Sequence, residues 1–563
     1  MKFHKFIPVI STMVFLCGCM QNNNLNRSSN PFAPSSSEPQ ISSETKPPYV
    51  PEISMWTGFG KDYNGEIWKV VNQYNGDHEG DAHITHVSQN NYSKLFANVT
   101  NSIDGRTYPH IVNGYPDHFA EYCHKGVMIP LDRYIEKYNE KHNTNLLEDF
   151  YPEYLKENTE IRYDSVSRKG YVMGLPFNKA TEVMVVNGYL MDYVCSIDPS
   201  ITVPETWQQL VINGPKIIAA IQTNMYGMAL TDSNAKLLIG TVSNGHASNF
   251  RISSASRIQD AELNAGEQIL QDVSQIANHN FRVLGYDNSS NAFRTMLHQW
   301  GSQFTEFSSD IYFDNHEFGY ATFWDEINKP KTLEGLKFWK DLYDERLIGL
   351  PGDWCLTNFC SNSFEAGTCM FNICSSGGLS NVVETNKRIE VRPILYYHDG
   401  VRTSKAVISQ GTSLGLLNQF SSKANREVEQ QAAFDAIVDF CTGETQAKWD
   451  CATGYFPPSH SAFNSATYQG FLNDPNPIAL QSIYRNTVIV DHDIYQNNGW
   501  VKFVDPGFLG SSSILNSCYN LLNNVFYLHY DTGHEGDAAN MNAKITSYMN
   551  DFWSKNIDDN VKR

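Results

Sequence analysis

Apolar and polar residues alternate with two different periods from residue 51 onward. Short apolar runs at 53–56, 82–87 and 111–112 have the length and composition of strands. Between them, apolar residues recur at helical spacing through 67–74 and again at Leu95 and Val99. The repeated order of strand, helix and strand predicts a parallel sheet with right-handed crossovers, and therefore an α/β fold.

The segment 170–207 places an extended stretch, a buried strand and a helix start in close succession. Its Leu-Pro-Phe-Asn at 175–178 is expected to be extended, because Pro fixes its own φ and disfavours helical geometry in the residue before it. The unbroken apolar run 183–186 predicts a strand covered on both faces, as in a parallel sheet. Thr206 and Gln209 fit a capping box, which predicts that a helix starts there.

This order of residues resembles the first interlobe crossing of the family 1 extracellular solute-binding proteins. These proteins capture substrates for ABC importers, and the maltose- and glycerol-3-phosphate-binding proteins are among them. Three other segments also resemble the family: the strand 364–370 with the Ser-Ser-Gly-Gly loop that follows it, the strand at 411–414, and Thr-Gly-Tyr-Phe-Pro at 453–457. The last is the most specific match, whereas an ordinary Gly-rich turn or any capped α/β helix would account for the others taken singly.

The resemblance implies a two-lobed α/β fold of the periplasmic-binding-protein type (type II), with a ligand cleft between the lobes. Three interlobe crossings are expected near Asn178, Val391 and Trp449. Lobe one is then predicted to contain residues 51–178 and 392–448, and lobe two residues 179–391 and 449–563. The Ser- and Asn-rich segment 231–290 is longer than the corresponding part of the family and receives no role.

The resemblance also implies a set of ligand-facing positions, namely Tyr92, Asp117, Trp207, Ser375, Gly411 and Tyr455. Tyr and Trp rings suit stacking on a sugar ring, while Ser375 and the amide of Gly411 would hydrogen-bond hydroxyl groups. Asp117 is a shifted match to an acidic position near the third strand. Each of these residues has an alternative role as a packed core residue, and that alternative is strongest for Trp207 and Tyr92.

The first 50 residues have the pattern of an exported, lipid-anchored protein. A basic start, an apolar region at 6–16 and Leu-Cys-Gly-Cys at 16–19 indicate an export signal too short to span a bilayer. The pattern resembles a lipobox, which implies a signal peptide 1–18 and lipidation of Cys19; a plain secretory signal is the alternative. Residues 19–50 are poor in apolar side chains and predict a disordered tether. The protein is thus expected at the cell membrane, on its extracytoplasmic face.

Composition excludes several classes of function. The formal net charge of −19, without any basic run, argues against nucleic acid and anionic lipid as partners. The sequence contains no GxSxG, HExxH or P-loop pattern and no recognisable catalytic carboxylates, so an enzyme such as a glycosidase is not expected. A surface adhesin or scaffold lipoprotein is the rival class, because an anchor and tether would serve it equally.

The cysteines and histidines predict neither a metal nor another cofactor. Nine cysteines remain beyond Cys17 and Cys19, an odd number, and close CxxC pairs of a zinc site are missing from the sequence. His83 and His86 are three residues apart on a predicted strand, which places them on opposite faces. The local candidates for disulfide pairing are Cys355/Cys360, Cys369/Cys374 and Cys441/Cys451.

Residues that depart from the family pattern change which solute is expected. Where the glycerol-3-phosphate branch carries a hydroxyl residue this chain has Ala180, and the phosphate-gripping Arg of that branch falls near Asn516. Loss of an Arg fork disfavours a phosphate far more than a neutral ligand. A neutral mono- or oligosaccharide is therefore expected, with glycerol 3-phosphate or its diesters as the alternative and Lys179 or Arg402 as substitute cations. The implied partners are ABC permease subunits and their ATPase, and the protein itself is expected to be a monomer.

Overall fold

The apolar runs near the start of the folded region form a parallel sheet, as predicted. Its strands are β1 (Glu52–Thr57), β2 (His83–Ser88) and β3 (Ile111–Gly114), and β1 pairs in parallel with both of the others. The connections are the helices α1 (Lys61–Asp77) and α2 (Tyr92–Ser102). The alternating exposure along β2 buries His86 and leaves His83 at the surface, which confirms that the two histidines lie on opposite faces.

This computed structural model describes residues 49–163, 167, 169–229, 240–243, 246–252, 267–269, 281–308, 318–354, 359–365, 367–382 and 389–557. The predicted signal peptide, Cys19, nearly all of the predicted tether and most of the segment 231–290 lie outside these residues. None of the helices within the described residues is both long and apolar enough to cross a membrane.

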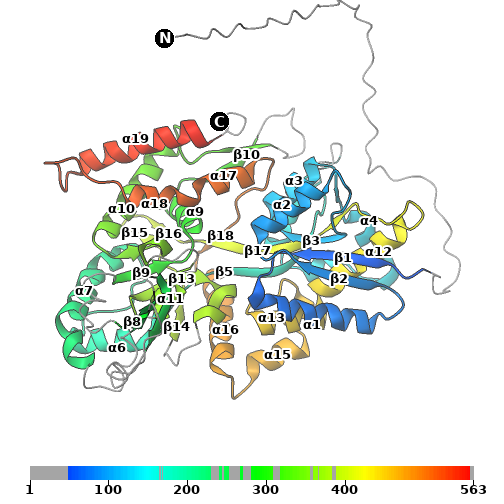
Figure 1. The fold of residues 1–563 in the computed structure, drawn as a ribbon, viewed down its shortest axis with the longest axis horizontal. Helices are drawn as coiled ribbons and strands as arrows, with labels where there is room; N and C mark the ends of the chain where they lie inside the picture. Colours follow the sequence, from blue (N-terminus) through cyan, green and yellow to red (C-terminus); the bar gives the residue numbers. More distant parts are fainter. Residues whose placement is uncertain are drawn as a thin grey trace, which may run out of the picture. The chain divides into compact units, whose positions relative to one another are not determined.

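Two long strands, β5 (Leu175–Asn187) and β17 (Ala406–Leu417), join the parallel sheet to the rest of the molecule (Figure 1). The first half of β5 pairs antiparallel with β17, whose second half continues antiparallel onto β3. The second half of β5 pairs antiparallel with β13 (Cys369–Ser375) and β14 (Ile389–Arg392). The resulting strand order is β12-β9-β13-β5-β17-β3-β1-β2.

The neighbours of β5 correct one expectation. All of its residues are buried, as the run 183–186 predicted, yet its partners β13, β14 and β17 run antiparallel to it. An unbroken apolar run shows that a strand is covered on both faces, but it carries no information about the direction of neighbouring strands. β13 in turn pairs in parallel with β9 (Arg282–Tyr286), which pairs in parallel with β12 (Ile348–Gly349).

Separate hydrophobic cores lie on either side of these long strands. Leu95, Val99 and Val112 share one core with Phe119 from α3 (Pro116–His124). The apolar run 183–186 belongs to another, larger core. Figure 1 shows the two groups of elements, blue and yellow on one side and mainly green and red on the other, with β5 and β17 running between them.

A third segment runs beside β5 after helix α13 (Gly443–Thr453). Gly454 ends this helix at φ +77°, and the amide of Phe456 then donates to the carbonyl of Lys179 at 2.7 Å. Two later segments of the chain therefore lie beside the first half of β5, at β17 and at Phe456. Val391, where the sequence places the second crossing, lies in β14 and pairs with Val185 instead. The division into lobes at residues 178, 391 and 448 stays a prediction.

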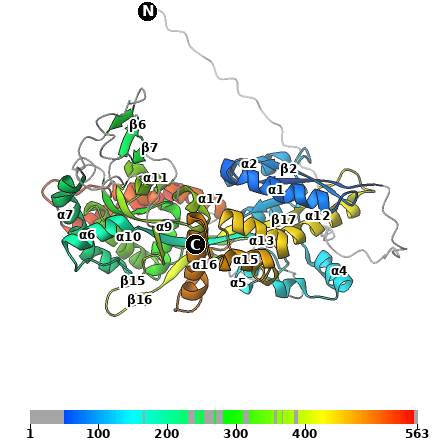
Figure 2. The ribbon, with the colours of Figure 1, turned by 90° about the horizontal axis from the view of Figure 1, so that it is seen from below.

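The remaining elements cover the faces and edges of this framework (Figure 2). The other helices are α4 (Asp132–His142), α5 (Pro152–Thr159), α6 (Gly188–Ile197), α7 (Trp207–Ala229), α9 (Ser289–Gln299), α10 (Lys329–Asp344), α11 (Ser361–Glu365), α12 (Arg426–Cys441), α14 (His460–Phe463), α15 (Ala466–Asn473), α16 (Ala479–Ile489), α17 (Ser511–Ser517), α18 (Leu521–Phe526) and α19 (Ala538–Asn556). The other strands are β4 (Met128–Ile129), β6 (Gly240–Ser243), β7 (His246–Ile252), β8 (Glu267–Ile269), β10 (Thr305–Phe307), β11 (Gly319–Ala321), β15 (Tyr397–His398), β16 (Thr403–Ser404) and β18 (Val501–Phe503).

The disulfide candidates do not form. Cys360, Cys374, Cys441 and Cys451 are free thiols, so each of the three proposed pairs loses at least one partner. Cys369 and Cys374 stand at opposite ends of β13, and five residues of strand span about 16 Å, far beyond the reach of a disulfide. Among the described residues, no three His, Cys, Asp or Glu side chains gather closely enough to hold a metal ion.

Candidate functional site

Aromatic residues follow the carboxyl ends of all three parallel strands. Phe59 and Tyr63 come after β1, Tyr92 after β2 and Tyr115 after β3. Because the carboxyl ends of parallel strands meet at one edge of a sheet, these side chains are brought together. The ring centroids of Phe59 and Tyr92 are 6.3 Å apart, and those of Tyr92 and Tyr115 are 5.0 Å apart.

The segment that follows α12 adds two more rings at this edge. The ring centroid of Trp449 in α13 lies 4.8 Å from that of Phe59. The ring of Tyr455 is nearly parallel to that of Trp449, with 6.1 Å between centroids. The ring of Tyr63 is 5.7 Å from that of Tyr455. We call this group the aromatic cluster; its members are Phe59, Tyr63, Tyr92, Tyr115, Phe177, Trp449 and Tyr455.

A chain of buried polar groups fixes the hydroxyl of Tyr92. The side chain of Asn178 donates to this hydroxyl at 3.2 Å and accepts from the hydroxyl of Thr412. Thr412 in turn accepts from Asn113 at 3.3 Å, and Asn113 accepts from the amide of Gly58 at 2.9 Å. These bonds connect β1, β3, β5 and β17, so the position of Tyr92 is set by the whole sheet edge.

Gly411 lies where β17 passes closest to β5. Its φ is +105°, and a Cβ atom at this position would lie 1.8 Å from the carbonyl oxygen of Asn178. Any other residue would therefore be strained in its backbone and would collide with β5. The contact between strands accounts for the glycine, and a ligand-facing role for its amide stays a prediction.

The loop after β13 contacts the aromatic cluster, although Ser375 itself is not the residue that does so. Ser375 pairs with Glu182 at the end of the strand, and the hydroxyl of Ser376 accepts from the amide of Thr181 at 3.2 Å. The carbonyl of Gly377 accepts a hydrogen bond from the hydroxyl of Tyr63. A Cβ atom at Gly377 would lie 2.6 Å from the ring of Tyr455, so this glycine allows the loop to lie flat on that ring.

The other two predicted site residues have different surroundings. Asp117, in the first turn of α3, accepts from the hydroxyl of Ser512 at 2.6 Å, and Glu121 accepts from the amide of Gly510 at 3.1 Å. Trp207 is fully buried in the larger core, where its indole donates to Gln299 at 2.6 Å and its ring packs on Trp339. The only donor of the indole is used and the ring is covered. In this structure Trp207 is therefore a packed core residue, which is the alternative considered from the sequence.

A polar group lies further along β5, around Glu182, four residues after Asn178. Glu182 accepts from the hydroxyl of Tyr286 and, at 3.1 Å, from the side chain of Asn291. Burial raises the pKa of Glu182 to about 7, against the opposing effect of these hydrogen bonds. Arg294 of α9 donates to Asn291 and, at 2.9 Å, to Asp505.

Asp505 completes this group, which we call the polar cluster: Glu182, Tyr286, Asn291, Arg294, His298 and Asp505. Burial alone would raise the pKa of Asp505, but the hydrogen bond with His298 and the charge of Arg294 lower it. Arg294 also acts on the aromatic cluster. Burial raises the pKa of Tyr115 well above its usual value, and the positive charge of Arg294 opposes that rise.

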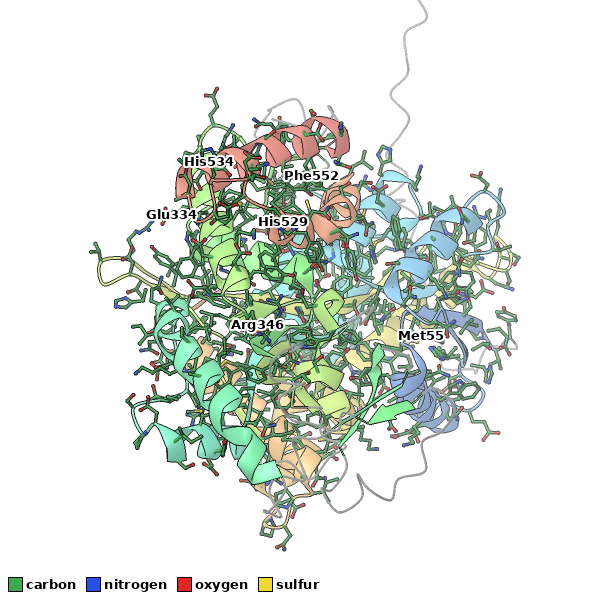
Figure 3. All side chains as sticks on the ribbon, turned by 60° about the vertical axis from the view of Figure 1, so that its left-hand side comes forward. Met55, Glu334, Arg346, His529, His534 and Phe552 are labelled. Carbon is green, nitrogen blue, oxygen red and sulfur yellow. The ribbon has the colours of Figure 1, made fainter. Side chains whose placement is uncertain are left out.

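Neither of the predicted substitute cations is available at the aromatic cluster. Lys179 is fully buried and forms an ion pair with Glu157. Arg402 pairs with Glu334 and Asp399 on the hairpin of β15 and β16. Figure 3 labels Glu334 and Met55 of β1 on opposite sides of the molecule, so Arg402 lies far from the strands that carry the cluster. Asn516 is exposed on α17.

Comparison with known proteins agrees with this fold. The family model described as "Bacterial extracellular solute-binding protein" matches residues 69–476. The chain belongs to this family. Members bind solutes rather than transform them, and the description places them outside the cytoplasm. A search of curated proteins finds no match.

Several solved structures share the fold at low sequence identity. UgpB from Mycobacterium tuberculosis, in complex with glycerophosphocholine, has a TM-score of 0.57 at 13% identity and covers 90% of this chain and 99% of its own. The GacH receptor of Streptomyces glaucescens, solved unliganded and with acarbose, scores 0.54 at 13% identity over 89% and 99% of the two chains. Lmo0181 from Listeria monocytogenes, in complex with cycloalternan, scores 0.56 at 15% identity over 89% and 100%.

Sequence reasoning found part of this site and missed part. It named Tyr92 and Tyr455, which the structure brings into one cluster, whereas Tyr63, Tyr115 and Trp449 were not proposed as ligand-facing. The signal for Tyr115 was present, because it lies three residues after the strand predicted at 111–112 and directly after the end of β3. Tyr63 lies inside α1, six residues after β1, so spacing alone gave no indication of its role.

Proposed function

We propose that this solute-binding protein captures a neutral mono- or oligosaccharide at the aromatic cluster and delivers it to an ABC importer. The observation that carries the proposal is the pair of partly exposed rings Tyr63 and Tyr455, whose centroids are 5.7 Å apart and which pack on the buried ring of Trp449. Flat rings with polar edges offer the apolar faces and hydroxyl groups that a sugar ring requires. The fixed hydroxyl of Tyr92 supplies an oriented hydrogen-bonding group beside them.

The charges of the described residues near the cluster also favour a neutral ligand. Lys179 is committed to Glu157, and Arg294 is committed to Asp505. A phosphate would have to compete with these carboxylates for the charge of either cation. Two of the structurally similar proteins are described in complex with acarbose and cycloalternan, which is consistent with a carbohydrate.

A glycerol phosphate or its diester is the second candidate, because one observation favours it. The Nε atom of Arg294 is buried and has no hydrogen-bond acceptor among the described residues, so the guanidinium retains a donor. UgpB, which has the same fold, is described in complex with glycerophosphocholine. A phosphate oxygen that reached Arg294 would satisfy this donor.

The proposal includes two lobes that close on the solute, with β5, β17 and the segment 454–456 as the shared hinge region. Contacts made by both lobes are complete only in the closed state, so the ligand stabilises closure. The hydrogen bonds from Ser512 to Asp117 and from Tyr63 to Gly377 would then form on closing. Lipidation at Cys19, a tether 19–50, a monomeric state and docking on separate permease subunits complete the proposed role.

A thermal-shift screen of residues 50–563 against neutral sugars and glycerophospho-compounds tests the proposal. We expect at least one neutral mono- or oligosaccharide to raise the melting temperature, and the Tyr455→Ala variant to lose that response. Stabilisation by glycerol 3-phosphate or glycerophosphocholine alone would establish the second candidate. A protein that binds a glycan or protein surface without any decrease in its radius of gyration would instead be an adhesin.

A further inference from the structure

A group of buried side chains, most of them charged, gathers where β5, β17 and β18 lie side by side. The charged members form two ion pairs, and their side chains are at most 9% exposed. The proposed solute site makes no use of this group. We call it the hinge network; its members are Tyr154, Glu157, Lys179, Asp491 and Lys502.

Lys179 occupies the point where three segments of the chain meet. Its backbone pairs with Gly411 of β17, and its carbonyl accepts from the amide of Phe456 at 2.7 Å. Successive side chains of a strand point to opposite faces, so Lys179 leaves β5 on the face opposite Asn178, which contacts the aromatic cluster. The ammonium of Lys179 forms an ion pair with Glu157 there, so α5 is attached to the first half of β5.

The second ion pair is held by the π-helical turn Val490–Tyr495, which directly follows α16. Asp491 in this turn accepts from the ammonium of Lys502 at 2.8 Å. At the other end of the turn, the hydroxyl of Tyr495 donates to the carbonyl of Glu182 at 2.9 Å. The turn is therefore attached to the second half of β5. Single π-helical turns next to α-helices occur frequently at functional sites.

Tyr154 is the side chain that joins the two ion pairs. Its hydroxyl accepts from the ammonium of Lys502 at 3.0 Å and lies 3.5 Å from Oδ2 of Asp491. Its ring centroid is 4.8 Å from Nζ of Lys502 and 5.4 Å from Nζ of Lys179. Burial raises the pKa of Tyr154 well above its usual value, so the hydroxyl keeps its proton and serves as both donor and acceptor.

Buried ion pairs contribute geometry rather than stability to the region they occupy. Desolvation offsets most of the attraction within such a pair, and an apolar contact of similar volume is often as stable or more so. A buried pair is favourable only while its partners keep the correct distance and direction. A displacement of α5 relative to the π-helical turn would therefore break the hydrogen bond of Tyr154 to Lys502, so the network favours one relative position of the two.

We propose that the hinge network is a pivot, in which Tyr154 links the two ion pairs and thereby favours the closed arrangement of the molecule. This inference rests on the proposed closing of two lobes. The contacts made in the closed arrangement are the hydrogen bonds from Tyr63 to Gly377 and from Ser512 to Asp117. Tyr154 acts through the ion pairs and is a positioning residue. Loss of its hydroxyl should shift the unliganded protein toward the open state.

Small-angle X-ray scattering of unliganded residues 50–563 tests the pivot with the variant Tyr154→Phe. This variant keeps the ring and both ion pairs, and its radius of gyration should be larger than that of the wild type. The matched control is Tyr151→Phe at the start of the same helix, because among the described residues its hydroxyl bonds no member of the hinge network. Val99→Ala, which lowers stability from within a core away from the hinge, is the second control. Both controls should keep the radius of the wild type.

A double-mutant cycle tests whether Tyr154 couples the ion pairs. Glu157→Gln and Asp491→Asn each remove one carboxylate from the network. Their combined effect on the unfolding equilibrium constant should differ from the product of the single effects by at least about threefold. In the Tyr154→Phe background most of this difference should disappear. The same difference in both backgrounds, or none in the wild type, would overturn the coupling.

An unchanged or smaller radius for Tyr154→Phe, or an equal increase in the Val99→Ala control, would overturn the pivot. Neither measurement uses a solute, and Tyr154→Phe alters no residue of the aromatic cluster. A screen in which no sugar stabilises the wild type would therefore count against the carbohydrate proposal alone, whereas the scattering result counts for or against the pivot.

Discussion

The aromatic cluster and the polar cluster contact neighbouring parts of β5, at residues 177–178 and at Glu182, and they are built by different means. The aromatic cluster is assembled from strand ends, and each ring is held by its neighbours within about 6 Å. The polar cluster is assembled around buried charges, and Glu182, Asn291 and Arg294 are held by hydrogen bonds that they make to one another. The four tyrosines of the aromatic cluster are partly exposed and offer surface to a ligand, whereas the polar groups of the polar cluster are largely hydrogen-bonded to one another.

Because of this difference, substitutions in the two clusters should have different effects, one on ligand affinity and the other on the free energy of unfolding. Truncating a ring of the aromatic cluster removes contact area, while removing a charge from the buried network leaves its partner uncompensated. We expect substitutions of the partly exposed tyrosines in the aromatic cluster to change ligand affinity, and substitutions of the buried charges to change the free energy of unfolding. The following experiments test this comparison, beginning with the largest expected effect.

Replacing Lys179 with Met should have the largest effect on stability. Its ammonium is fully buried against Glu157, so removing it leaves a buried carboxylate without its ion-pair partner and should cost about 3–5 kcal/mol. Burial already raises the pKa of Glu157, so the cost should be smaller at pH 6, where the carboxyl takes up a proton more easily, than at pH 8. Urea unfolding of Lys179→Met measures this effect.

The control is the double variant Lys179→Met with Glu157→Gln, which should recover part of the lost stability. If Lys179→Met instead unfolds like the wild type and loses binding of glycerol 3-phosphate, then Lys179 serves the ligand. That outcome would support the role of substitute cation considered from the sequence.

The pH dependence of the free energy of unfolding should reveal the titration of the Glu182 carboxyl group. Its pKa in the folded protein is about 7, whereas a carboxyl group in the unfolded chain titrates near its ordinary value of 4.5. Between these two values the folded state retains a proton that the unfolded state has lost, so stability falls as the pH rises from about 4.5 to about 7. The contribution is on the order of 3 kcal/mol.

Glu182→Gln removes the titrating group and should flatten this part of the profile. Asp287 has a pKa raised to about 7 by burial as well, so the variant should retain the portion of the decrease that Asp287 causes. Unfolding free energies at pH 5 and pH 7.5 for both proteins test the assignment. An identical decrease in the two proteins would show that Glu182 does not titrate in this range.

Replacing Tyr455 with Ala should affect binding more than stability. The ring is half buried between Trp449 and Gly377, and loss of such a stacking surface is worth about 2 kcal/mol of ligand binding, or roughly thirtyfold in affinity. The melting temperature of the unliganded protein should remain nearly unchanged. Tyr455→Phe keeps the ring and serves as the control. Unchanged binding by the Ala variant would remove Tyr455 from the site.

Local patterns predicted the parallel sheet and part of the aromatic cluster. The strands around 53–56, 82–87 and 111–112 were predictable because each run is short, apolar and followed by a helical repeat. Tyr455 was predictable because Thr-Gly-Tyr-Phe-Pro is a specific string. The directions of the partners of β5 were not, since strand direction depends on residues about 200 positions away, such as those of β13 and β17.

Other parts of the site depend on tertiary contacts that no local pattern encodes. Trp207 fits the motif position, yet Gln299 and Trp339, far along the chain, enclose it in the core. Asp117 matches an acidic position, yet its partner is Ser512, almost 400 residues later. The polar cluster likewise combines β5, α9 and Asp505, which no periodicity in the sequence connects.

The smallest expected effect concerns the hydrogen bond between Asp117 and Ser512. It joins α3 to α17, and the proposed lobes meet there. A hydrogen bond to a charged group contributes about 1.5 kcal/mol or slightly more, and part of that is recovered from water when the lobes separate.

Ser512→Ala should therefore shift the unliganded protein toward the open state and weaken ligand binding about three- to tenfold, without changing any residue of the aromatic cluster. Small-angle X-ray scattering should show a larger radius of gyration for unliganded Ser512→Ala than for the wild type, and equal radii for both proteins with saturating ligand. Ser513→Ala, one position further along on the exposed face of α17, is the matched control. If Ser512→Ala weakens binding with no change in the radius of gyration of the unliganded protein, the effect of Asp117 is on the ligand itself, and its assignment as a ligand-facing residue gains support.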